Sequence, residues 1–225
     1  SLGYDTPTSR RRVAEMASFF GIETWFYKNV AELSGGQKQL LNLASVMAMQ
    51  PSVLILDEPT SQLDPIAASD FLATLGRINR ELGTTILLTE HRLEDAFPLA
   101  TDVAVIDHGR LLCTGTPAQV GKELRREGHA MFLAMPTAMR VWASVKSDDD
   151  CPVTVREGRD WLNIWASQHQ LNALPPEPAH PKSEELAIEA KELWFKYEKD
   201  APDVVRGLTQ TEKKGEFLAL LGGNG

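Results

Sequence analysis

The chain has 225 residues, with 23 Lys and Arg against 31 Asp and Glu, so its formal net charge is −8. This balance argues against a nucleic-acid binder that neutralises phosphates over a broad basic face. The 43% of hydrophobic residues excludes a disordered chain. No stretch approaches the ~20 apolar residues that span a bilayer, so we expect any membrane role to be peripheral. Cys113 and Cys151 lack metal-ligand spacing and are expected to be reduced thiols of a cytosolic protein.

The first half of the chain alternates the patterns of helices and strands. Apolar residues at helical spacing predict helices over 7–20, 34–50, 65–82 and 92–99. Short apolar runs without alternation predict strands buried on both faces, over 53–56 and 84–89. Two more strands are predicted around a turn at His108 and Gly109, over 103–107 and 110–113. This order is typical of an α/β fold with a mostly parallel sheet and flanking helices.

The second half changes character after about residue 116. Helices are predicted over 117–127, 135–146 and 155–168. Four prolines between Leu174 and Ser183 favour an extended linker. Beyond it, strands are predicted over 186–198 and 217–221, as the start of a new unit.

The strongest chemical motif is the pair of acids Asp57 and Glu58, which directly follows the apolar run 53–56. A buried strand ending in adjacent carboxylates is how a P-loop ATPase places two acids at the edge of its sheet. The first can hold Mg²⁺ and the second can polarise an attacking water. The alternative is two acids that merely cap a turn before Pro59.

Two further features accompany this pair. Ser34, Gly35, Gly36 and Gln37 stand at the amino end of a predicted helix, where small residues let a phosphate approach free N–H groups. His91 follows the strand 84–89 and could contact a γ-phosphate beside the attacking water. Taken alone, the glycine-rich segment could be a flexible helix cap, and His91 could be a surface histidine.

Together these motifs resemble those of ABC-type ATPases, over roughly residues 1–116. LSGGQ at 33–37 is similar to the signature, LILDEPTSQLD at 54–64 to the Walker B and D-loop, and His91 to the switch histidine. The resemblance implies that Asp57 serves the metal and Glu58 is the catalytic base. It also implies that Asp64 lies in the D-loop, that His91 senses the γ-phosphate, and that the cofactors are ATP and Mg²⁺.

The new unit resembles the beginning of a second such domain. Tyr197 looks like the aromatic that stacks on adenine after the entry strand, and the alternative is a core aromatic. The final residues Gly222, Gly223, Asn224 and Gly225 read as the first half of a P-loop. We therefore expect a fragment with the end of a first domain at 1–116, a helical extension and linker at 117–185, and the start of a second domain at 186–225.

ABC domains work as head-to-tail pairs, so the resemblance implies that this chain holds half of each of two ATP sites. We expect negligible hydrolysis by the isolated chain. The expected partners are the second ABC domain of the same chain, an integral membrane coupling protein and a substrate-binding membrane subunit. Nucleic acid is not expected as a partner, and the expected location is the cytoplasmic face of the membrane.

Three local segments are most similar to energy-coupling factor ATPases, which drive vitamin and metal-ion uptake: 89–94, 151–158 and 195–197. Alternatives are the fused ATPase of a sugar importer, a soluble two-headed ATPase that binds the ribosome, and a degenerate domain without turnover. The resemblance also implies a groove for the partner's coupling helix, with candidates Phe19, Phe20, Trp25 and Phe26. For each of them the alternative is a position in the core of the helical subdomain. A last hypothesis places strand 217–221 beside strand 53–56, in a gap left by a missing P-loop strand.

Overall fold

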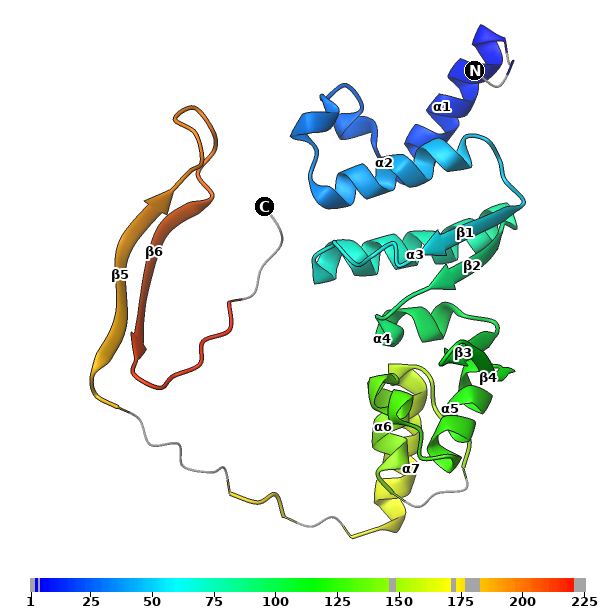
Figure 1. The fold of residues 1–225 in the computed structure, drawn as a ribbon, viewed down its shortest axis with the longest axis vertical. Coiled ribbons are helices and arrows are strands. Elements are labelled where there is room, and N and C mark those ends of the chain that lie inside the picture. The colour runs from blue at the N-terminus through cyan, green and yellow to red at the C-terminus, as the bar shows by residue number, and fades with distance from the viewer. Residues whose placement is uncertain (1–2, 4, 146–148, 171–172, 177–182, 221–225) are drawn as a thin grey trace. The chain divides into compact units, whose positions relative to one another are not determined.

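The computed structural model describes residues 3, 5–145, 149–170, 173–176 and 183–220 (Figure 1). Contacts divide the chain into two compact units, residues 1–171 and 172–225. Each unit is described by itself below. Among the described helices, none combines the length and the apolar character that crossing a bilayer requires.

The first core lies where helices cover a parallel strand pair. Strands β1 (Val53–Asp57) and β2 (Thr85–Thr89) run parallel, with Asp57 opposite Thr89. Three helices pack against them: α1 (Thr6–Phe20), α2 (Gly35–Met47) and α3 (Pro65–Leu82). Short 3₁₀ helices at Glu23–Trp25 and Val30–Glu32 connect α1 to α2. These elements confirm the helices and strands predicted over residues 7–89.

The burial predicted for the two strands is wrong. Leu54 is 5% exposed, whereas its neighbours Val53 and Ile55 are 53% and 70% exposed. Successive side chains of a strand point to opposite faces, and the helices cover only the face that holds Leu54, Leu56, Ile86 and Leu88. An apolar run without alternation therefore does not reveal which face is covered.

A second core in the same unit joins a hairpin to the later helices (Figure 1). The hairpin pairs β3 (Val103–Asp107) with β4 (Arg110–Gly115). The helices are α4 (Leu93–Ala96), α5 (Pro117–Arg126), α6 (Thr137–Ala143) and α7 (Val155–Gln168), with 3₁₀ helices at Phe97–Leu99 and Ala130–Ala134.

Prolines explain two departures from the predicted helices. The helix predicted over 92–99 ends as α4 at Ala96 and continues as a 3₁₀ helix that contains Pro98. The helix predicted over 135–146 begins only at Thr137, because Pro136 stands at its N-cap, and it ends at Ala143. Proline has no N–H to donate and is tolerated at helix starts rather than interiors.

The unit 172–225 contains a long antiparallel hairpin of β5 (Leu186–Phe195) and β6 (Val205–Lys213) (Figure 1). Strand β6 was not predicted, because its apolar and polar residues alternate only weakly. The strand predicted over 217–221 does not form in its described part: residues 217–220 are not in a strand, and Phe217 is 96% exposed. The described partner of β1 is β2. Residues 217–220 therefore do not form the strand that was hypothesised to extend the sheet beside β1, since an apolar run forms a strand only where another strand supplies backbone hydrogen-bond partners.

Candidate functional site

The carboxyl ends of β1 and β2 bring the predicted acids and the histidine together. Asp57 is the last residue of β1, and its Oδ1 accepts a hydrogen bond of 2.5 Å from Thr89 Oγ1 at the end of β2. This bond holds one carboxylate oxygen of Asp57 and leaves the other for a further ligand. Thr89 is a site residue that the sequence reasoning missed.

Glu58 adopts a backbone conformation that is rare for its residue type. Its φ is +43°, in the left-handed region. Such a residue costs on the order of 1–3 kcal/mol, so the surroundings must enforce it. Here the Glu58 N–H donates to both the carbonyl oxygen and the hydroxyl of Thr89, each at 3.1 Å. The end of β2 thus sets the turn that follows Asp57.

The Glu58 side chain meets His91. The distance from His91 Nε2 to Glu58 Oε1 is 2.8 Å, and the two side chains are 81% and 47% exposed. The Asp57 carboxylate instead contacts Thr89. The two acids therefore have separate partners, because Asp57 ends β1 whereas Glu58 lies just beyond it in a left-handed turn.

Thr60 and Glu90 connect the loops that carry these residues. Thr60 is 2% exposed, and its hydroxyl donates to Glu90 Oε2 at 2.7 Å. The other oxygen of Glu90 accepts from the N–H groups of His91 and Arg92. The sequence reasoning missed both residues, because no motif distinguishes a carboxylate that binds neighbouring backbone.

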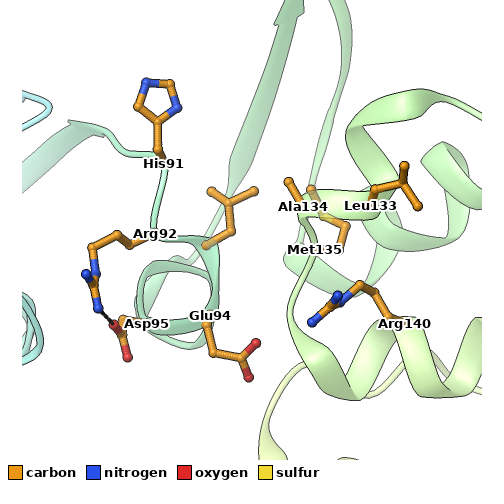
Figure 2. A pocket seen from close by; sticks show the side chains of 9 residues that line it. His91, Arg92, Glu94, Asp95, Leu133, Ala134, Met135 and Arg140 are labelled. Carbon is orange, nitrogen blue, oxygen red and sulfur yellow. Dashed lines mark ion pairs between the residues drawn. The ribbon is translucent and has the colours of Figure 1, made fainter. Parts of the chain in front are cut away.

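A hollow of about 300 Å³ adjoins His91 on the side of α4 and α6. Figure 2 shows His91 pointing away from the ion pair of Arg92 and Asp95. On the α6 side, Glu94 Oε2 accepts from both the N–H and the hydroxyl of Thr137. His91 thus lines the edge of this hollow, and its ring also reaches Glu58, with Nε2 2.8 Å from Oε1.

The glycine-rich motif forms the amino end of α2. Ser34 is its N-cap, and the Ser34 hydroxyl accepts from the N–H of Gln37 at 3.3 Å. Gln37 Oε1 in turn accepts from the Ser34 N–H at 3.0 Å, which completes a capping box. Gly35 has nothing within 4 Å of where a Cβ would stand. The first turn is therefore open to an approaching phosphate.

The amino ends of α2 and α3 lie against each other. A Cβ on Gly36 would stand 3.0 Å from Ala67 Cβ on α3. Gln39 Nε2 also donates to the carbonyl of Pro59, in the loop after Glu58. Asp64 caps α3 by accepting from the N–H groups of Ile66 and Ala67 at 3.0 Å. The predicted D-loop aspartate thus has a structural role in this chain.

The remaining predicted site residues lie in the unit 172–225. Tyr197 follows the end of β5 and is 80% exposed, with its ring 5.1 Å from that of Phe195 in an edge-to-face contact. Its exposure argues against a core aromatic. The predicted P-loop residues Gly222, Gly223, Asn224 and Gly225 lie outside the described residues.

A second hollow, of about 640 Å³, lies beside α1. Of the four aromatic residues predicted to receive a partner helix, Phe26 lines this hollow and is 41% exposed. Phe20 and Trp25 are only 6% and 9% exposed and belong to the first core, and Phe19 packs against that core, so the alternative of a core position holds for these three. Tyr27, which was not predicted, also lines the hollow and is 95% exposed.

The carboxylate of Asp57 at the end of β1 suits a metal ion that takes few ligands from the protein. Within the described ranges, no group of three or more His, Cys, Asp or Glu side chains could hold a metal ion. Mg²⁺ is commonly held by one or two carboxylates, with phosphate and water oxygens as its other ligands. Asp57, with one oxygen bonded to Thr89, fits that role.

Comparison with known proteins gives matches over the whole chain. A family model described as ABC transporter matches residues 4–61. An ABC transporter ATP-binding protein of Bacillus cereus is 41% identical over 100% of this chain, and another of Clostridium tetani is 32% identical over 98%. The chain spans 40% and 48% of the length of these two relatives.

One solved structure is similar in both fold and sequence. It is cbiO1 from Clostridium perfringens, described as part of the ABC transporter complex cbiONQ. The two chains are 33% identical with a TM-score of 0.51, and the match covers 60% of this chain and 55% of cbiO1.

Proposed function

Because this chain belongs to the ABC transporter ATP-binding family and has its P-loop NTPase fold, we propose that it is part of an ATPase that powers transport through a membrane complex. The observation that supports this most directly is the 2.8 Å contact between His91 Nε2 and Glu58 Oε1. It joins a carboxylate and a histidine at the carboxyl ends of two parallel strands, where α/β sheets bind their ligands.

Glu58 is proposed as the general base and His91 as its partner. The Glu58 carboxylate would accept a proton from the water that attacks the γ-phosphate. The His91 imidazole, at hydrogen-bonding distance from Oε1, would orient that carboxylate and contact the phosphate. Both side chains are substantially exposed, so water and nucleotide can reach them. Positioning of this kind supplies most of the catalysis in phosphoryl transfer.

Asp57 would hold the magnesium ion that accompanies ATP. When bound, Mg²⁺ neutralises charge that develops on the phosphate oxygens. Asp57 is suited to this because the bond from Thr89 fixes its carboxylate at the end of β1. Asp57 and Glu58 have different partners, so one can serve the metal while the other receives the proton.

Ser34, Gly35, Gly36 and Gln37 are proposed to contact the phosphates of a second ATP, bound by another ABC domain. The capping box orders this turn, and the helix dipole favours an anion there. Asp64 would lie at the boundary between the two domains. Tyr197 would stack on adenine, and Gly222, Gly223, Asn224 and Gly225 would begin the P-loop of the second domain on the same chain.

We propose further that the transporter is of the energy-coupling factor type and takes up a vitamin or a metal ion. The likeness to cbiO1, itself part of a transporter complex, supports this branch. The partners would be an integral membrane coupling protein and a substrate-binding membrane subunit, which place the ATPase at the cytoplasmic face of the membrane. The hollow beside α1, with exposed Phe26 and Tyr27, would receive the coupling protein.

ATP turnover by the full-length protein in its membrane complex tests the catalytic assignment. Glu58→Gln keeps the size of the side chain but removes the base, so we expect kcat to fall by at least ~100-fold while ATP still binds. The matched control is Glu81→Gln, on the exposed end of α3, which should leave turnover unchanged. Turnover in Glu58→Gln equal to that of the wild type would refute the assignment.

Site-specific photo-crosslinking tests the partner. A photoreactive phenylalanine analogue at Tyr27 should capture an integral membrane protein of the complex. The same analogue at His169, which is exposed on the far end of α7, is the control. Equal capture from both positions, or capture from His169 alone, would exclude the hollow beside α1 as the docking site.

A further inference from the structure

Glu90 stands directly before His91, and both of its carboxylate oxygens have partners. Oε2 accepts from Thr60 Oγ1 at 2.7 Å. Oε1 accepts from the N–H of His91 at 2.9 Å and from the N–H of Arg92 at 3.1 Å. One side chain thus connects the backbone around His91 to a residue thirty positions earlier in the chain.

Thr60 is part of the turn that follows Glu58. The Ser61 N–H donates to the carbonyl of Glu58 at 3.2 Å, and the Leu63 N–H donates to that of Thr60 at 3.0 Å. Because Thr60 is 2% exposed, its hydroxyl is held in place by its surroundings. Glu90 therefore links two loops, one carrying Glu58 and the other carrying His91.

The His91 ring depends on this link for its position. The ring is 81% exposed, so packing contributes little to its orientation. A ring can stay 2.8 Å from Glu58 Oε1 only if the backbone beneath it is fixed. The two N–H groups bound by Glu90 Oε1 belong to His91 itself and to the next residue.

We propose that Glu90 is a positioning residue that holds His91 against Glu58 for the hydrolysis proposed above, on which this role rests. The hydrogen bonds of Glu90 to Thr60, His91 and Arg92 require the shape of its side chain and not its charge. A glutamine at this position could accept both N–H groups through Oε1 and donate from Nε2 to the Thr60 oxygen. An alanine could do neither. This difference separates positioning from an electrostatic role.

Amide hydrogen exchange tests the link without requiring any ATP turnover. In the 225-residue chain, Glu90→Ala should raise the exchange rates of the His91 and Arg92 N–H groups by about tenfold or more, because they lose their acceptor. Glu90→Gln should leave both rates within about threefold of the wild type. Thr60→Val, which replaces the hydroxyl with a methyl group, should raise the same two rates, and Thr60→Ser, which keeps the hydroxyl, should not.

Kinetics of the full-length protein test the consequence. Glu90→Ala should lower kcat about tenfold or more while the KM for ATP changes less than about twofold, since the lost alignment matters in the transition state. Glu90→Gln should restore most of the rate. The control Glu81→Ala, on the exposed end of α3, should change neither exchange at His91 nor kcat.

Three outcomes would overturn the proposal. One is unchanged exchange at His91 and Arg92 in Glu90→Ala. The second is faster exchange with a wild-type kcat. The third is a glutamine variant as impaired as the alanine variant, which would assign the effect to charge. If the wild-type protein has no ATP turnover, the proposed function fails, and the exchange rates still decide whether Glu90 holds His91.

Discussion

Replacing Gly36 with alanine tests how closely the amino ends of α2 and α3 approach, and Gly35 provides a matched control. Both glycines lie in the first turn of α2. A Cβ on Gly35 would meet nothing within 4 Å, whereas a Cβ on Gly36 would stand 3.0 Å from Ala67 Cβ. The two substitutions therefore add the same methyl group to the same turn in different surroundings.

The magnitudes follow from two opposing effects. Alanine is favoured over glycine within a helix by roughly 0.5–1 kcal/mol, so Gly35→Ala should stabilise the fold by up to that amount. At Gly36 the same gain is opposed by crowding, because carbon atoms prefer separations of about 3.5–4.0 Å. Overpacking of this kind costs about 1–3 kcal/mol. We expect Gly36→Ala to be less stable than Gly35→Ala by about 1–3 kcal/mol.

Urea denaturation followed by circular dichroism at 222 nm measures this difference, because the described helices all lie within residues 6–168. A shifted midpoint with an unchanged slope reports stability alone. Ala67→Gly removes the opposing methyl, so in a double-mutant cycle it should recover most of the loss caused by Gly36→Ala. If Gly36→Ala stabilises the fold as much as Gly35→Ala, the two helix ends are not in close contact.

Three further predictions concern stability and reactivity. Leu72→Ala should cost about 2–5 kcal/mol in urea denaturation because Leu72 is 0% exposed, while Leu82→Ala, at a residue 44% exposed, should cost clearly less. Burial raises the pKa of Cys151 to about 11, so iodoacetamide at pH 8 should modify it ~100-fold more slowly in the folded than in the unfolded chain; equal rates would contradict its burial. Hydrogen bonds from Thr154 and Val153 lower the pKa of Glu157, so its contribution to stability is complete above its ordinary pKa and is lost as pH falls through the lower folded value. The difference in unfolding free energy between the wild type and Glu157→Gln should therefore shrink from pH 6 to pH 3, and a constant difference would refute this.

Local signals in the sequence determined most of the secondary structure and the composition of the site. Helical spacing over 65–82 predicted α3, and the residues of LSGGQ predicted the start of α2. Asp57, Glu58 and His91 could be chosen because strands end at the same edge of a parallel sheet. These inferences need only neighbours in the chain and the period of each element.

Tertiary contacts decided what local patterns could not. Only the packing of α1, α2 and α3 shows that one face of β1 is covered and the other, with Ile55, is exposed. Strand β6 forms because β5 supplies its backbone hydrogen-bond partners, whereas residues 217–220 form no strand. The left-handed Glu58 depends on Thr89, thirty-one residues away, and the His91 loop depends on Thr60 through Glu90. Hydrogen bonds between distant residues leave no periodic trace in a sequence, because any Thr or Glu could make them and only the folded chain selects which ones do.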